Sequence, residues 1–156
     1  MTVMHSGGCQ CGALRFRGSD FGRSSICHCR MCQKAFGSPF ALLATVRDLE
    51  WTRGAPRYFQ SSNKVRRGFC AECGTPLTFD YGGPVEVAVC AFDDPSVAPP
   101  TLQLNLESKQ PFFDGMCALP VRAEGAEPKS DAFKASIVSY QHPDHDTAQW
   151  PPQGGR

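Results

Sequence analysis

The chain has 156 residues, and its 16 lysine and arginine residues against 15 aspartate and glutamate residues give a formal net charge of +1. This length fits one domain, and the near-zero charge argues against a nucleic-acid partner or a polybasic membrane anchor. The longest apolar run, residues 40–46, is far too short to span a bilayer. Residues 1–6 lack the charged and apolar regions of a secretory signal, so we expect a cytoplasmic protein without a membrane partner.

Short apolar segments recur along the chain, separated by turns that draw on 15 glycines and 13 prolines. Their alternating or continuous apolar character predicts β-strands. In chain order, the predicted strands cover residues 13–17, 40–46, 58–59, 65–69, 77–79, 85–89 and 101–106. Many short strands at close spacing predict a mainly β, strand-dominated fold.

Two segments have helical rather than strand character. Residues 30–36 are expected to form one or two helical turns. Near the end of the chain, Ser130 and Asp131 are expected to cap a short helix over residues 132–140, since Phe133, Ile137 and Tyr140 recur at helical spacing. The sequence therefore predicts little helix, most of it beyond the strands.

Cysteine carries most of the functional information. Of nine cysteines, seven fall in three tight groups, which are Cys9 with Cys11, the triplet Cys27, Cys29 and Cys32, and Cys70 with Cys73. In a reducing compartment disulfides are rare, so clustered cysteines indicate metal ligands or catalytic groups. Closely spaced thiolates suit tetrahedral zinc, whereas the triplet lacks the spacing of a ferredoxin iron–sulfur cluster. We therefore expect zinc.

The number of thiolates suggests two different sites. Seven ligands do not fill two closed tetrahedra, but they fit one site of four cysteines and one of three, which leaves a position for water or substrate. The triplet is the natural open site because it is already local. The spacing alone also permits Cys9 or Cys11 to complete a site with the triplet.

Three segments resemble the signature motifs of a known family. They are GGCQCGALRF at 7–16, CHCRMCQK at 27–34 followed by Gly37, and RGFCAECGTPL at 67–77, with weaker matches in FDDP at 92–95 and ESK at 107–109. The pattern is similar to that of the glutathione-dependent formaldehyde-activating enzyme family, which shares its domain with centromere protein V. The resemblance extends over residues 7–115.

The resemblance implies a β-tent fold with two zinc ions, built as one zinc-binding domain over residues 5–115. A C-terminal extension, residues 116–156, is expected to lie on or near that domain. The implied structural site joins Cys9, Cys11, Cys70 and Cys73, and the implied catalytic site is Cys27, Cys29 and Cys32. The implied activity adds glutathione sulfur to formaldehyde, giving S-hydroxymethylglutathione, and is classed as a carbon–sulfur lyase by its reverse direction.

Cationic side chains near the cysteine groups are candidates to bind the two glutathione carboxylates. These candidates are Lys34, Lys64, Arg66 and Arg67. For each of them, ordinary solvated surface is the competing interpretation. His28 lies between two predicted ligands, so it is a candidate for proton transfer or for support of the metal site, with a packed histidine as the alternative.

The chain departs from the family pattern at two positions. Gln103 stands where many relatives have a histidine, and Cys90 stands where glycine is usual. We expect Cys90 and Cys117 to act as inert small hydrophobic residues. The segment from His142 to Asp146 also holds Asp144 and His145; a flap over the zinc or a further metal site is one interpretation, and a polar loop is the favoured one.

The sequence thus favours a zinc enzyme acting on a thiol adduct of a small aldehyde. Two alternatives stay open, a non-catalytic zinc-stabilised binding module and a thiol or metal sensor. A deep pocket ending at the cysteine triplet would favour the enzyme, whereas an exposed aromatic or basic face would favour the binding module.

Overall fold

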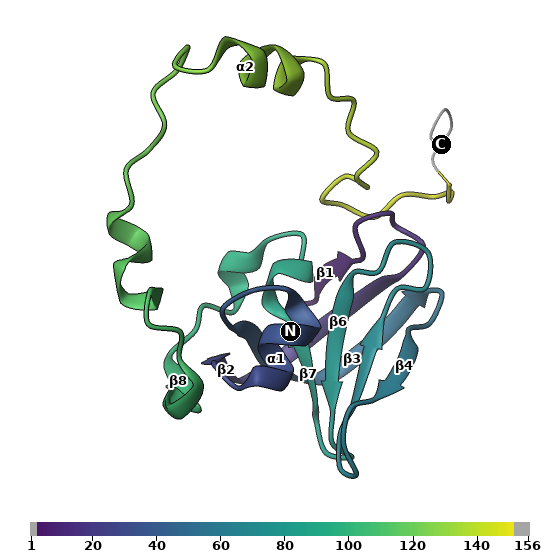
Figure 1. The fold of residues 1–156 in the computed structure, drawn as a ribbon. Helices are drawn as coiled ribbons and strands as arrows, with labels where there is room; N and C mark the ends of the chain where they lie inside the picture. The colour runs from purple at the N-terminus through teal and green to yellow at the C-terminus, as the bar shows by residue number, and fades with distance from the viewer. Residues whose placement is uncertain (1–2, 152–156) are drawn as a thin grey trace.

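A computed structural model describes residues 3–151, and its centre is one curled, mostly antiparallel sheet of eight strands (Figure 1). The strand order is β1-β2-β3-β7-β6-β5-β4, and β8 pairs in parallel with the end of β2. The strands are β1 (His5–Gly8), β2 (Arg15–Cys27), β3 (Ala41–Arg53), β4 (Arg57–Gln60), β5 (Arg66–Phe69), β6 (Pro76–Asp80), β7 (Val85–Ala88) and β8 (Leu102–Leu104). The predicted mainly β fold is confirmed.

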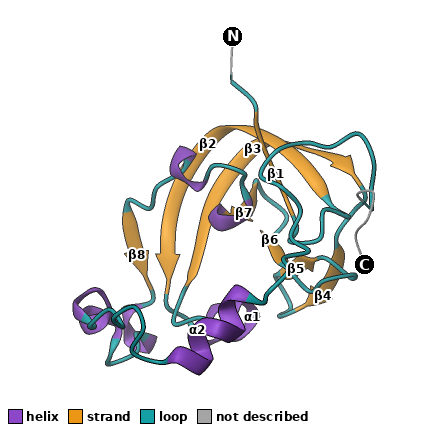
Figure 2. Ribbon diagram, turned by 90° about the horizontal axis from the view of Figure 1, so that it is seen from above, coloured by secondary structure: helices purple, strands orange, loops and turns teal. Residues whose placement is uncertain are grey.

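Two long strands shape the sheet. β2 and β3 have 13 residues each and curve across the molecule in Figure 2. The predictions of strand at 13–17 and 40–46 were too short, because serines interrupt the apolar pattern in β2 and charged residues follow Val46 in β3. These serines are nevertheless buried with bonded hydroxyls, since Ser19 donates to Asp48 at 3.2 Å and Ser24 to the Ala98 carbonyl at 2.8 Å. β1 was also missed; its sequence, HSGG, carries no apolar alternation.

The main core lies under the first half of β2. Phe16 is fully buried and meets Trp51 and Phe92 edge-on, with ring centroids 5.6 and 5.1 Å apart. Edge-to-face aromatic contacts add to the free energy gained by burying the rings. The cysteines Cys9, Cys11 and Cys70 belong to the same core cluster. The first and third cysteine groups are therefore part of the hydrophobic core.

Helix α1 (Arg30–Phe36) forms where it was predicted. Cys29 is its N-cap, and the Cys29 sulfur accepts a hydrogen bond from the Cys32 backbone N–H at 3.4 Å. The helix ends at Gly37, whose φ of 57° is the left-handed conformation that favours glycine. Capping thus holds the Cys29 sulfur against the first turn of α1, which carries Cys32.

The chain beyond β8 leaves the sheet and returns. In Figure 1 it forms a wide arc that carries α2 (Pro128–Ala135), and residues 117–129 and 132–141 are all exposed. The predicted helix over 132–140 begins four residues earlier because Pro128 suits the first helical turn. It ends at Ala135 with Ser136 as its C-cap, so Ile137 and Tyr140 lie outside it. Residues 152–156 of the predicted extension lie outside the described residues.

The remaining regular elements are four short 3-10 helices, η1 (Val89–Ala91), η2 (Pro95–Val97), η3 (Leu106–Ser108) and η4 (Phe113–Ala118). The predicted strand over 85–89 therefore stops at Ala88 and turns into η1, and the one over 101–106 shrinks to β8. Between residues 3 and 151, the helices are all too short or too polar to cross a membrane.

A buried ion pair fastens the segment after η1 to the sheet. The Arg15 side chain is 3% exposed, and its guanidinium donates to both oxygens of Asp93, at 2.8 and 2.5 Å. Ser6 Oγ donates to the same carboxylate at 2.5 Å. Burial opposes ionisation of Asp93, but the hydrogen bonds from Arg15 and Ser6 outweigh it and hold the Asp93 pKa below its usual range.

We therefore expect Asp93→Asn to lower the free energy of unfolding by about 3 kcal/mol, since Arg15 stays buried with only Asp146 as its remaining carboxylate. A depressed pKa stabilises the fold above the unfolded pKa of ~3.9. The difference between wild type and variant should thus be constant at neutral pH and shrink as the pH falls through the folded pKa. Denaturant unfolding across this pH range measures it. Asp114→Asn, at an exposed pair with Lys109, is the control, and an equal loss there would contradict the expectation.

Candidate metal centres

The first and third cysteine groups meet in one cluster. Cys9, Cys11, Cys70 and Cys73 bring their sulfurs within 4.8 Å of one another. Cys11 Sγ lies 3.6 Å from Cys9 Sγ and 3.9 Å from Cys70 Sγ. In a tetrahedral zinc site with zinc–sulfur bonds of ~2.3 Å, neighbouring sulfurs are ~3.8 Å apart. The donor type and spacing therefore fit a closed four-thiolate zinc site, which we name the four-cysteine cluster.

The middle group forms a second cluster by itself. The sulfurs of Cys27, Cys29 and Cys32 also lie within 4.8 Å of one another. Cys32 is 1% exposed, whereas Cys27 and Cys29 are partly exposed. Among the residues from 3 to 151, these two clusters are the groups of three or more metal-ligating side chains that could hold an ion. The partition into four and three is thus the one in the structure, and Cys9 and Cys11 do not join the triplet.

The protonation of the two clusters follows from their surroundings. The hydrogen bond from Cys32, aided by Cys29 and by the charge of Arg67, lowers the pKa of Cys27 to about 5. Burial opposes ionisation of Cys73, but hydrogen bonds from Thr75 and Cys11 lower its pKa to about 6. Burial raises the pKa of Cys9 to about 12. Each cluster therefore contains a sulfur whose pKa is lowered below 7 by its neighbours, and a bound metal ion would favour deprotonation of its thiol ligands.

The C-terminal segment docks on the four-cysteine cluster. The His142 backbone N–H donates to the Gln10 carbonyl at 2.8 Å, and Trp150 Nε1 donates to the Cys11 carbonyl at 2.7 Å. Asp146 adds ion pairs to Arg15 and Arg17, both at 2.9 Å. The flap hypothesis placed this segment over the zinc; its contacts lie on the loop of the four-cysteine cluster and on the start of β2. The further metal site at 142–146 is not formed by these residues.

Gly12 is the point of closest approach between that loop and His142. Its φ is 79°, and a Cβ built there would lie 2.1 Å from His142 Cδ2. We expect Gly12→Ala to cost about 1–3 kcal/mol of backbone strain and, in addition, to displace His142. Gly82→Ala is the matched control, because Gly82 has a φ of 86° and nothing within 4 Å of its Cβ position.

Chemical denaturation of the zinc-loaded variants, followed by tryptophan fluorescence, compares the two glycines. Gly12→Ala should lose more stability than Gly82→Ala. It should also shift the fluorescence emission of the folded protein, since the indole of Trp150 binds the carbonyl of Cys11 next to Gly12. Equal losses with unchanged emission would show that His142 does not dock tightly.

The four predicted cationic side chains separate into two groups. Arg67 is 7% exposed, and its Nη2 donates to Cys32 Sγ at 3.5 Å. Lys34 lines the hollow next to it. Arg66 points elsewhere, to Asp80 at 2.7 Å, and Lys64 is exposed in the turn before β5. The geometry thus brings Arg67 and Lys34, but not Arg66, close to the triplet.

His28 is a packed histidine with a defined partner. It is fully buried, its Nε2 lies 2.8 Å from Gln103 Oε1, and Phe113 meets its ring edge-on at 4.6 Å. Its Nδ1 has no hydrogen-bond partner within the described part of the chain. Gln103, the departure from the family pattern, therefore contacts the residue between Cys27 and Cys29.

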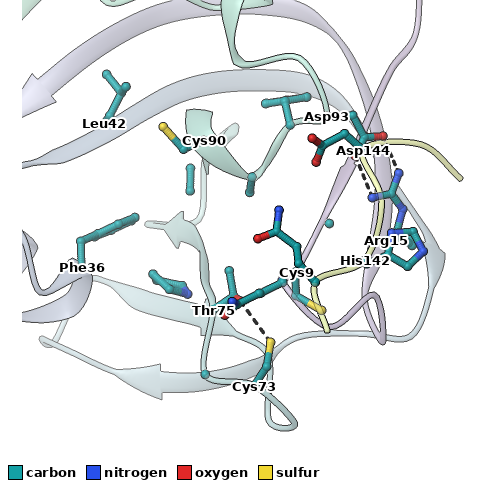
Figure 3. Close-up of a pocket in the computed structure, with 18 of the residues that line it drawn as sticks. Cys9, Arg15, Phe36, Leu42, Cys73, Thr75, Cys90, Asp93, His142 and Asp144 are labelled. Carbon is teal, nitrogen blue, oxygen red and sulfur yellow. Dashed lines mark hydrogen bonds and ion pairs between the residues drawn. The ribbon is translucent and has the colours of Figure 1, made fainter. Parts of the chain in front are cut away.

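Two hollows lie near the clusters. A cavity of about 750 Å³ holds Cys9 and Cys73 in its wall, with Phe36, Leu42 and Cys90 at one end and Arg15 and Asp93 at the other (Figure 3). No cysteine of the triplet lines it, so this cavity is not the deep pocket at the triplet that would favour the enzyme over the binding module. A smaller hollow of about 500 Å³ is lined by Lys34, Phe59 and Arg67 among others, and Arg67 connects it to Cys32.

The two cysteines outside the clusters were expected to be inert hydrophobic residues. Both are exposed instead. Cys90 lies in η1 rather than on a strand, because the chain turns at Val89, and Cys117 lies in η4 on the arc. No sequence signal distinguishes a strand from a 3-10 turn within the run VAVCAF.

Comparisons with known proteins identify the family of the chain. The family model described as glutathione-dependent formaldehyde-activating enzyme matches residues 4–108. No curated protein matches the chain. A crystal structure of a Rhodobacter sphaeroides protein, a structural-genomics target, is similar at 22% identity and a TM-score of 0.50, covering 63% of this chain and 98% of that one; this likeness shows the fold alone. The chain belongs to the glutathione-dependent formaldehyde-activating enzyme family.

Proposed function

We propose that the protein is a cytoplasmic, zinc-dependent carbon–sulfur lyase that acts on a glutathione or other thiol adduct of a small aldehyde, similar to S-hydroxymethylglutathione. The observation that carries the proposal is the contrast between a closed cluster of four thiols and a cluster of three. A site with three protein ligands keeps a position for substrate. Family membership supports glutathione as the thiol.

The proposal assigns each centre a role. Cys9, Cys11, Cys70 and Cys73 hold a structural zinc ion, and Cys27, Cys29 and Cys32 hold a catalytic one. A zinc ion with an open position stabilises a thiolate or polarises a carbonyl oxygen at neutral pH. Carbon–sulfur bond formation joins the thiol sulfur to the aldehyde carbon, and the thiol proton ends on the resulting hydroxyl oxygen. The reverse reaction breaks the same bond.

The residues around the triplet would hold the substrate. Lys34 and Arg67 line the hollow next to Cys32, and Lys34, which is exposed, is the one placed best to bind a glutathione carboxylate. Lys64 and Arg66 do not line this hollow. We propose that His28 keeps Cys27 and Cys29 in position rather than moving a proton, because its ring is fully buried and packs edge-on against Phe113 and Phe40.

Zinc per chain, measured on protein purified with a phosphine reductant, tests the proposal together with a direct assay. NMR of glutathione with formaldehyde should show faster exchange between free and adduct forms when the protein is present. Two zinc ions per chain and accelerated exchange would support the proposal. Exchange at the uncatalysed rate in protein that holds two zinc ions would contradict it.

A non-catalytic binding module is the second candidate, and the arc favours it. Apolar side chains on this exposed segment include Leu119, Val121, Phe133 and Val138, with exposed fractions between 68% and 93%. Exposed apolar patches often mark interaction surfaces. Unaccelerated exchange, together with full zinc loading, would point to this function.

A further inference from the structure

Arg67 is a buried cation without a carboxylate partner. Arg67 is buried at 7% exposure, and no ion pair to Asp or Glu forms with it in residues 3–151. Its Nη1 also has no hydrogen-bond partner among these residues. A buried charge that lacks a counter-charge destabilises a fold strongly. Something near Arg67 must therefore be negative in the working protein.

The neighbouring arginine shows the ordinary case. Arg66 is exposed, donates to Asp80 Oδ2 at 2.7 Å and lies over the Tyr58 ring at 4.2 Å. Adjacent residues of a strand face opposite sides of a sheet, so Arg66 and Arg67 differ in surroundings although they share a sequence context. Arg66 is therefore a matched control for Arg67.

The contacts of Arg67 identify its counter-charge. Its Nη2 donates to Cys32 Sγ at 3.5 Å, its Nε donates to Ser61 Oγ at 3.1 Å, and its guanidinium lies 5.1 Å from the Phe79 ring centroid. Ser61 and Phe79 are neutral, so the sulfur cluster is the group that can supply the negative charge. The serine hydroxyl and the aromatic ring fix the direction of the guanidinium toward Cys32.

The net charge of the metal site explains the effect of the Arg67 cation. A zinc ion with three thiolates carries a net charge of −1, and Arg67 brings the buried group to zero. A fourth thiolate from outside would raise the charge of the metal site alone to −2, and Arg67 lowers this to −1. Low-polarity surroundings make each uncompensated charge costly. A cation that is already in place lowers the cost of accepting the fourth thiolate.

We propose that Arg67 is the counter-cation that lets the cluster of Cys27, Cys29 and Cys32 accept an external thiolate ligand. It is a positioning residue that acts through Cys32, and the chemical feature to which it responds is the thiolate sulfur rather than a carboxylate. The class of ligand is therefore small thiols in general, neutral ones included. This inference rests on the proposed function, because it assumes a metal ion at the triplet.

Cobalt-loaded protein tests the inference without an activity assay, since thiolate ligation of cobalt(II) gives a charge-transfer absorption that reports each added sulfur. Wild type, Arg67→Gln, Arg67→Lys and Arg66→Met are titrated with glutathione and with 2-mercaptoethanol, a neutral thiol. We expect Arg67→Gln to bind both thiols at least tenfold more weakly. Arg67→Lys and Arg66→Met should stay within about threefold of wild type.

The other results would overturn the inference. The first is an unchanged thiol affinity in Arg67→Gln. The second is a loss of affinity in Arg67→Gln for glutathione but not for 2-mercaptoethanol. The third is a loss of thiol affinity in Arg67→Lys as large as that in Arg67→Gln. If Arg67→Gln does not hold two metal ions, the thiol affinity of Arg67→Lys is the deciding measurement. A tenfold loss of thiol affinity in Arg67→Lys would contradict the role of the positive charge. If wild type binds neither thiol, the proposed function fails as well; if wild type binds both and Arg67→Gln binds equally, only this inference fails.

Discussion

Cys70→Ser is expected to abolish cooperative folding. Cys70 is 1% exposed in the main core, and the four-cysteine cluster joins the loop after β1 to the loop between β5 and β6. Structural zinc in small domains contributes an apparent free energy of ~10–16 kcal/mol, as much as or more than the whole stability of a typical domain at ~5–15 kcal/mol. Losing one thiolate of a closed site therefore removes most of what holds these loops together.

Thermal melts followed by circular dichroism, with zinc counted per chain, measure this effect. The control is Cys117→Ser, because Cys117 is exposed and lies outside both clusters. Cys117→Ser should melt as wild type does with two zinc ions. A cooperative melt of Cys70→Ser near the wild-type temperature would show that the four-cysteine cluster does not support the fold.

Cys29→Ser is expected to keep the fold and to lower the turnover at least a hundredfold. Cys29 is partly exposed, and its local structural role is to cap α1. Serine is a good N-cap, so the helix should remain. Its hydroxyl is a poor replacement for a thiolate ligand, so zinc should fall from two ions to one per chain.

The same melts and zinc counts, with the glutathione–formaldehyde exchange assay, measure this second effect. Cys90→Ser is the control, because Cys90 is exposed in the wall of the larger cavity and belongs to neither cluster. If Cys29→Ser unfolds as Cys70→Ser does, the division into a structural and a catalytic centre is wrong. If Cys29→Ser keeps full turnover, the triplet does not carry the chemistry.

The C-terminal segment docks on the four-cysteine cluster rather than on the triplet. His142 and Trp150 bind the carbonyls of Gln10 and Cys11, while residues 141–144 also line the cavity of about 750 Å³. Loss of metal from the four-cysteine cluster would therefore loosen a wall of that cavity as well as the sheet. Removing the chain from residue 141 onward tests the tail separately, by its effect on thiol affinity and turnover.

Local sequence patterns were enough to predict the cysteine groups and the class of fold. Ligands two or three residues apart stay close in any compact turn, so the triplet and the two pairs were visible as groups. The number seven then favoured a division into four and three. Strand length was harder, because buried serines such as Ser19 and Ser24 break the apolar alternation on which the prediction depends, and their hydrogen-bond partners lie 29 and 74 residues away along the chain.

Which of two adjacent arginines serves the triplet depends instead on packing between distant segments. Alternation along β5 places Arg66 and Arg67 on opposite faces, but the face that meets Cys32 depends on how β5 packs against α1, 35 residues earlier in the chain. The tail depends on tertiary structure even more, since Trp150 lies 139 residues from Cys11. Neighbouring ligands are close in any conformation of the chain, whereas contacts between distant segments arise only when the sheet curls and brings its loops together.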